Sequence, residues 1–126
     1  MFKETKISLS GNPVSGDMIY KKNQKGFIYL SQTGKNRKLD YQWQAKSQFK
    51  GAPTKEELEI EVKYYCVNKR RRDMDNLSKL FTDSLQGIVY ENDCQITKDS
   101  HEMFVDPENP RIEITLRERK GQKLKS

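Results

Sequence analysis

The stretch that decides the fold is LEIEVKYYC at residues 58–66, in which every second side chain is apolar. Successive side chains of a β-strand point to opposite faces, so this pattern predicts a strand with one buried and one solvated face. Cys66 falls on the apolar face, where we expect a structural rather than a reactive thiol. The core of the protein is therefore predicted to form against residues 58–66.

Upstream of this strand the sequence predicts two more extended segments. Residues 7–10 alternate like a first strand, and residues 26–31 form a second short extended segment. The loop expected between them is basic, with Lys21, Lys22 and Lys25.

Residues 35–49 predict an amphipathic helix, because their apolar side chains recur at i, i+4 spacing. We expect Ser31 or Thr33 to cap this helix and Trp43 to belong to its core-facing side. Gly51 and Pro53 then break the helix before the central strand.

Downstream of the central strand, residues 74–88 repeat apolar side chains every three or four positions, which predicts a second helix that ends at Gly87. Residues 94–105 and 112–116 both alternate, and a Pro-rich turn at residues 107–110 separates them. This arrangement favours a β-hairpin.

The predicted fold is α+β, with a small mixed β-sheet packed with two main helices in a single domain. The 126 residues are 33% apolar and 33% charged, so the core is thin and dimerisation would help to stabilise it. We place the domain at residues 1–116 and expect a flexible, basic C-terminal tail at residues 117–126.

Composition and charge narrow the function. No apolar run is long enough for a membrane span, and two cysteines without a CxxC pair predict reduced thiols, so we expect an intracellular, cytoplasmic protein without membrane contact. The formal net charge of +6 and a pI near 9.3 suit a polyanionic partner. An ordinary solvated basic surface explains the charge equally well.

The stretch with the strongest chemical signal is KRRRDMDNLSK at residues 69–79, where a run of cations meets Asp73 and Asp75. In an extended or turning backbone these two carboxylates point the same way, and at about 5 Å they would repel by roughly 3 kcal/mol at a dielectric constant near 20. A cationic group must offset that repulsion, either a metal ion or the side chains of Arg72 and Lys79. The same spacing suits an ordinary ion cluster in which Asp75 caps a helix and Lys79 lies one turn along.

A third acid, Asp93, follows the second predicted helix, and a short return loop is expected to bring it near the strand end that precedes Asp73. Mg²⁺ prefers such hard carboxylate ligands and completes its shell with phosphate oxygens. The neighbouring arginines would hold phosphates, and Lys79 would stabilise charge on a scissile phosphate. This pattern indicates phosphodiester cleavage.

The order of these residues resembles the RusA family of Holliday-junction resolvases. The matching motifs are RDMDNLSK at residues 72–79, DSLQG at residues 83–87 and NDCQI at residues 92–96. The resemblance covers residues 58–116 well and extends more loosely to Asn12-Pro13 and Ser31. It implies the RusA-like fold, a homodimer and activity on four-way DNA junctions.

The resemblance also implies roles for individual residues. The implied catalytic residues are Asp73, Asp75, Asp93 and Lys79. The three aspartates would be the metal ligands, for Mg²⁺ or for Mn²⁺ in its place. The residues expected to bind DNA are Lys69, Arg70, Arg71, Arg72 and Asn76. The chain departs from the family pattern at Asn92, where the family often has an aspartate directly before the one that corresponds to Asp93. We expect this difference to affect the tuning of the site more than its activity.

The leading hypothesis is a Mg²⁺-dependent, structure-selective endodeoxyribonuclease that resolves four-way (Holliday) junctions by paired nicks from a homodimer, in DNA recombination and repair. The alternative is a non-catalytic basic DNA- or RNA-binding protein. A metal-nucleotide transferase is a remoter reading, because the chain has no Gly-rich phosphate loop. The resemblance also allows a phage or prophage origin.

Overall fold

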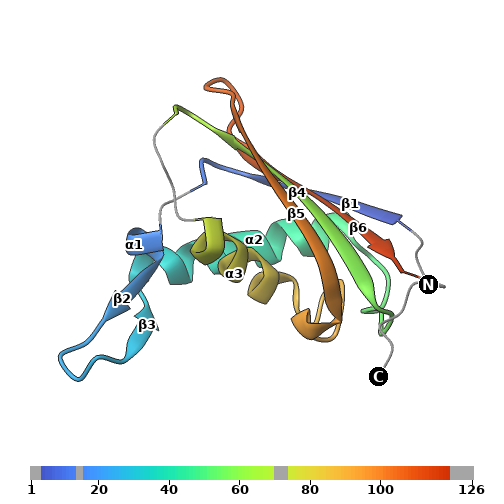
Figure 1. The fold of residues 1–126 in the computed structure, drawn as a ribbon, viewed down its shortest axis with the longest axis horizontal. Coiled ribbons are helices and arrows are strands. Elements are labelled where there is room, and N and C mark those ends of the chain that lie inside the picture. Colours follow the sequence, from blue (N-terminus) through green and yellow to red (C-terminus); the bar gives the residue numbers. More distant parts are fainter. Residues whose placement is uncertain (1–3, 14–15, 70–73, 120–126) are drawn as a thin grey trace.

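The computed structural model describes residues 4–13, 16–69 and 74–119, and in residues 16–17 and 74–76 it describes the backbone only. Within these ranges a four-stranded sheet and a two-stranded hairpin accompany two main helices (Figure 1). The elements in chain order are β1 (Glu4–Ser10), α1 (Gly16–Ile19), β2 (Tyr20–Lys22), β3 (Ile28–Leu30), α2 (Gln32–Gln48), β4 (Leu58–Cys66), α3 (Met74–Leu85), the 3₁₀ turn η1 (Asp93–Gln95), β5 (Ile96–Val105) and β6 (Arg111–Glu118).

Strand β4 is the centre of the main sheet, whose strand order is β1-β6-β4-β5. It pairs antiparallel with β6 and parallel with β5. Every second residue of β4 from Leu58 to Cys66 is buried, as the alternation predicts, and the Cys66 thiol lies in the core. The predicted α+β class, with a mixed sheet and two main helices in one domain, is confirmed.

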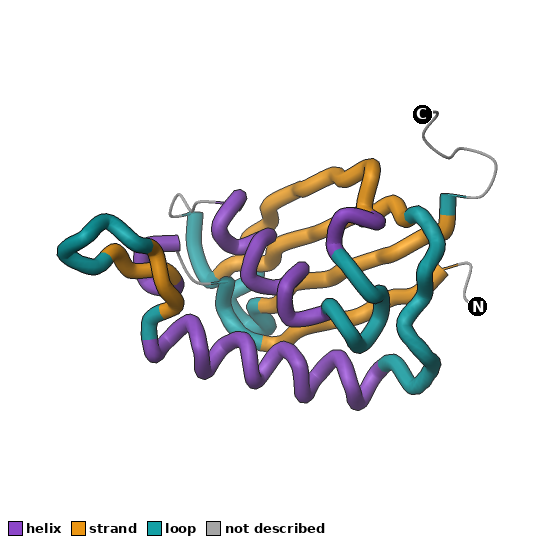
Figure 2. Tube along the Cα trace, turned by 90° about the horizontal axis from the view of Figure 1, so that it is seen from below, coloured by secondary structure: helices purple, strands orange, loops and turns teal. Residues whose placement is uncertain are grey.

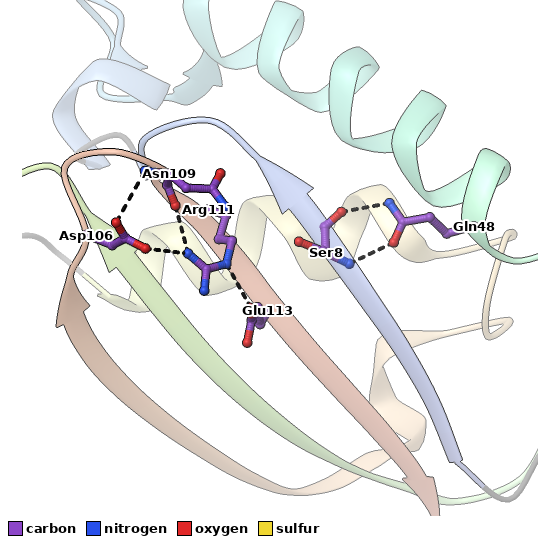
Figure 3. Close-up of polar contacts among 6 residues, drawn as sticks. All are labelled: Ser8, Gln48, Asp106, Asn109, Arg111 and Glu113. Atoms are coloured by element: carbon purple, nitrogen blue, oxygen red, sulfur yellow. Dashed lines mark hydrogen bonds and ion pairs between the residues drawn. The ribbon is translucent and has the colours of Figure 1, made fainter.

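Both main helices cover the same face of the sheet (Figure 2). Helix α3 connects the parallel strands β4 and β5, so this part of the chain is a β-α-β unit. The core-facing residues of α3 are Leu77, Leu80, Phe81, Ser84 and Leu85. Helix α2 lies along β1, where the Gln48 amide accepts a hydrogen bond from the Ser8 N–H at 2.8 Å and donates one to the Ser8 carbonyl at 2.7 Å (Figure 3).

The predicted hairpin of the two C-terminal strands is wrong, because β5 and β6 lie on opposite sides of β4. The connection between them passes the end of β4, where the Asp106 N–H donates to the Cys66 carbonyl at 2.8 Å. Arg111 braces this turn with ion pairs to Asp106 at 2.9 Å and Glu113 at 2.8 Å (Figure 3). Alternation identifies a strand but does not encode which strand it pairs with.

Ser31 is the N-cap of α2, as predicted, and its hydroxyl accepts a hydrogen bond from the Gly34 N–H at 3.0 Å. The expectation that Trp43 faces the core is wrong, since its exposed fraction is 74%. The helix buries Tyr41 and Ala45 instead. Positions 41 and 43 point about 200° apart on a helix, so the side that carries Tyr41 and the side that carries Trp43 cannot both face the sheet.

Two further differences concern the segments outside the main sheet. Lys21 and Lys22, expected in a loop, lie on β2, which pairs antiparallel with β3. At the other end, β6 continues to Glu118, and Arg117, assigned to the tail by prediction, pairs with Glu61 at 3.1 Å. Residues 120–126 of that tail lie outside the described ranges. In the described ranges no helix is long and apolar enough to cross a membrane.

Candidate active site

The solvent side of α3 carries the ionisable residues of the candidate site. Since Leu80 and Phe81 face the sheet, Lys79 is exposed and Asp83, one turn further on, is half-buried. The Lys79 ammonium lies 5.2 Å from the centre of the Tyr20 ring, which comes from β2. Burial raises the pKa of the Tyr20 phenol, and the Asp83 carboxylate raises it further. Lys79, Tyr20 and Asp83 therefore form one cluster between α3 and the hairpin.

The predicted residues before α3 are only partly described. Asp73, Arg70, Arg71 and Arg72 lie outside the described residues, and Asp75 and Asn76 belong to the first turn of α3 with their backbones alone described. Lys69 is exposed close behind β4. The structure thus places Asp75 one helical turn from Lys79.

The segment after β1 and the segment after β4 are joined by a hydrogen bond close to the start of the basic run at residues 69–72. The Asn12 side-chain oxygen accepts a hydrogen bond from the Val67 N–H at 3.1 Å, which joins the segment after β1 to the segment after β4. Asn12 therefore fixes the point from which the chain leaves the sheet toward Lys69.

Asp93 begins the 3₁₀ turn η1, and its carboxylate is exposed. Its N–H donates to the Gln86 side-chain oxygen at 2.8 Å, just beyond the end of α3. Gln95 holds the same turn in place, because its side-chain amide donates to the Thr54 carbonyl at 2.9 Å and the Glu56 carbonyl at 2.8 Å. Asp93 is therefore presented to solvent on a braced turn.

The Asp93 charge also reaches the buried Tyr90. Burial raises the pKa of the Tyr90 phenol, and the Asp93 and Asp83 carboxylates raise it further. The phenol donates a hydrogen bond to the Thr82 carbonyl at 2.6 Å. Tyr90 thus stays neutral and fixes the loop after α3 against the helix.

The expected return of Asp93 to the strand end that precedes Asp73 is wrong. The chain leaves β4 at Cys66 and continues toward α3. In contrast, η1 lies at the opposite end of β4, where Leu58 pairs with Ile96. Along α3, Asp75 and Gln86 are eleven positions apart in sequence, which is about 16 Å at the rise of an α-helix. The turn η1, which begins at Asp93, and the first turn of α3, which contains Asp75, thus lie at opposite ends of α3 within one chain.

The metal ligands remain predictions. Among the residues that the structure describes, no three His, Cys, Asp or Glu side chains are grouped to hold a metal ion. Two of the three predicted ligands, Asp73 and Asp75, have side chains that lie outside the described part of the chain.

Sequence reasoning missed Tyr20 as a neighbour of Lys79, because nothing local links two residues so far apart in the chain. Gln86 and Gln95 stood in the quoted motifs without a role, and the structure shows that they fix the Asp93 turn. The usable signal for Gln95 was its place three residues after Asn92, since the two form a capping box.

Comparison with known protein families identifies the family of the chain. The model of the family described as "Endodeoxyribonuclease RusA" matches residues 10–117, a range that includes the hairpin, both main helices and η1. No curated protein matches the chain. Since the match covers most of the chain, this protein belongs to the RusA family of endodeoxyribonucleases.

Proposed function

We propose that this protein is a Mg²⁺-dependent, structure-selective endonuclease that resolves four-way DNA junctions by paired nicks from a homodimer, in DNA recombination and repair. The observation that carries the proposal is the position of Lys79. Its ammonium is exposed, lies against the Tyr20 ring and stands one helical turn from Asp75 in a chain of an endodeoxyribonuclease family.

Lys79 has the chemistry needed at a scissile phosphate. A fixed cation stabilises the negative charge that builds on the phosphate oxygens as the bond to the leaving oxygen breaks. The Tyr20 ring limits where the long side chain can point, and burial raises the pKa of its phenol, which is therefore neutral at neutral pH. Lys79 is therefore a preorganised electrostatic group.

The carboxylates Asp73, Asp75 and Asp93 fit Mg²⁺ by the chemistry of their donors, because Mg²⁺ selects hard oxygen ligands. When bound, the metal would activate a water and neutralise phosphate charge. Mn²⁺ prefers the same ligands and would replace Mg²⁺. The basic residues Lys69, Arg70, Arg71 and Arg72, with Asn76, would hold the flanking phosphates.

The placement of Asp93 supports the homodimer. Two aspartates that share one Mg²⁺ ion have α-carbons within roughly 11 Å, given metal–oxygen distances of about 2.1 Å and the length of the side chain. Asp75 and Gln86, whose side chain holds the Asp93 turn, are about 16 Å apart along α3, which favours ligands from two chains. We propose that Asp93 of one subunit completes the metal site of the other subunit, beside the first turn of α3 in that other subunit. Two-fold symmetry then gives the dimer two such sites, each built from both chains.

The decisive experiment is cleavage of a synthetic four-way junction with end-labelled strands, in Mg²⁺, in Mn²⁺ and in EDTA. We expect paired, ligatable nicks with either metal, none with EDTA, and none in a linear duplex of the same sequence. Asp75→Asn should abolish the nicks, whereas Asp40→Asn, which removes an exposed carboxylate on α2, should leave them unchanged. Tight junction binding without any cleavage in either metal would instead favour the non-catalytic DNA-binding alternative.

A further inference from the structure

The hairpin of β2 and β3 projects from the body of the protein beyond the two main helices (Figures 1 and 2). The turn at its tip is closed by hydrogen bonds, since the Asn23 side-chain oxygen accepts from the Lys25 N–H at 2.9 Å and from the Phe27 N–H at 3.0 Å. Gly26 adopts φ +87°, a conformation that side chains disfavour. The hairpin is therefore a preformed projection.

Three consecutive apolar residues on this projection face solvent. The exposed fractions are 67% for Phe27, 66% for Ile28 and 51% for Tyr29. Single exposed apolar residues are normal, but successive side chains of a strand alternate, so Tyr29 lies on the face opposite Ile28 and the hairpin exposes apolar side chains on both faces. Apolar surface exposed in this way is typical of a contact surface.

The positive charge around these apolar residues indicates the chemical class of the partner. Residues 18–39 contain six basic side chains and no acidic one. Lys21, Lys22 and Lys25 are all exposed, and none of them forms an ion pair with a residue that the structure describes. Protein interfaces are depleted of lysine, and two copies of this hairpin would repel each other. A polyanion with apolar surfaces, which is the description of DNA with exposed bases, fits best.

One face of the hairpin is continuous with the candidate site. Tyr20 pairs with Leu30 and Lys22 pairs with Ile28, so these four side chains share one face of the two-stranded sheet. Tyr20 contacts Lys79 at the inner end of that face. Lys22 and Ile28 therefore continue the surface from Lys79 toward the tip.

We propose that the β2–β3 hairpin is a DNA-contacting arm. Its lysines bind backbone phosphates next to the scissile one, and Phe27, Ile28 and Tyr29 pack against bases that are unstacked at the branch point of a four-way junction. The inference rests on the proposed function for the identity of the substrate. It adds a second determinant of structure selectivity, separate from the basic run at residues 69–72.

The test compares two hairpin variants with matched controls in EDTA, so that binding is measured without cleavage. Phe27→Ala/Tyr29→Ala removes apolar contact, with Met103→Ala on β5 as the control for an exposed apolar residue. Lys21→Ala/Lys22→Ala/Lys25→Ala removes charge, with Lys50→Ala as the control. Lys50 follows the far end of α2, which separates it from the hairpin by about 25 Å of helix. Circular dichroism checks that each variant folds.

We expect the apolar variant to lose about tenfold in affinity for a four-way junction, the scale of one lost base-stacking contact, and to bind linear duplex as the wild type does. The lysine variant should bind both DNAs more weakly, and its slope of log affinity against log salt should flatten by about one per lost contact. Both controls should bind like wild type.

Three results would contradict the proposal that the hairpin is a DNA-contacting arm. The first is wild-type junction affinity in both hairpin variants, and the second is an equal loss on junction and duplex in the apolar variant. The third is conversion of dimers to monomers by the hairpin variants in sedimentation, which would make the hairpin a contact between subunits. Failure of the proposed function shows separately, as wild-type protein that binds junctions but does not cut them in Mg²⁺ or Mn²⁺.

Discussion

The ammonium of Lys79 on α3 lies 5.2 Å from the centre of the Tyr20 ring on β2, a contact that joins the motif-bearing helix to the projecting hairpin. Such a cation–π contact contributes about 0.5–2 kcal/mol, depending on its exposure to water. It gives the lysine a defined direction although its side chain is exposed. The candidate site is thus built from two elements that are remote in the sequence.

Lys79→Met should lower the single-turnover rate on a four-way junction by about a hundredfold or more, the scale for removal of one preorganised electrostatic partner. Methionine keeps similar length and helix propensity, so the free energy of unfolding should change by only about 0.5 kcal/mol. Lys46→Met, at the exposed last turn of α2, is the matched control. An unchanged rate for Lys79→Met would return this residue to an ordinary surface position.

Tyr20→Leu should slow turnover by about two- to thirtyfold, which corresponds to loss of the cation–π contact. Tyr20→Phe should restore the wild-type rate, because it keeps the ring and the phenol it removes is already neutral at neutral pH. The single-turnover rate and the affinity for a junction are measured for both variants. If the Phe variant is as slow as the Leu variant, the hydroxyl rather than the ring is what matters.

Asp75→Asn and Asp93→Asn should each be inactive alone, yet their co-expression should recover nicking. A heterodimer of the two has one site with both changes and one intact site, so random pairing leaves about a quarter of all sites intact in a two-fold dimer. These sites should nick one strand per junction and regain Mn²⁺ binding, measured by electron paramagnetic resonance. Persistent inactivity of the mixture would show that each chain supplies its own Asp93.

Gly34→Ala should destabilise the protein, although alanine favours helices. An added methyl group would lie 2.5 Å from the Ile19 carbonyl oxygen and 3.1 Å from Leu30, so the base of the hairpin must move away from α2. We expect the free energy of unfolding in urea to fall by about 1–3 kcal/mol. Gly51→Ala meets only the Phe49 ring, at 3.4 Å, and should have a small effect.

Asp106 should make stability depend on acidity. The hydrogen bond from Arg111 lowers the pKa of the Asp106 carboxyl below its ordinary value of 3.8. A lowered pKa in the folded state gives stability that is present above pH 3.8 and lost as the pH falls through the folded-state pKa. The difference in urea stability between wild type and Asp106→Asn should therefore vanish in acid.

Much of the local structure could be read from the sequence. The alternation at residues 58–66 and the apolar spacing after Met74 predicted β4 and α3, because burial on one face imposes a period of two on strands and 3.6 on helices. The Ser31 cap was readable for a similar reason, since its hydroxyl meets a backbone N–H only three residues away. The motif around Lys79 likewise indicated the family, which the match over residues 10–117 confirms.

Only the tertiary structure decided which of these elements meet. It separated β5 from β6 by inserting β4, chose Tyr41 over Trp43 as the buried face of α2, and placed Tyr20 against Lys79. It also set Asp93 at the end of α3 far from Asp75. Periodicity records whether a side chain is buried, but not what buries it. Partners distant in the chain are selected by packing of the whole core, which no local window of sequence contains.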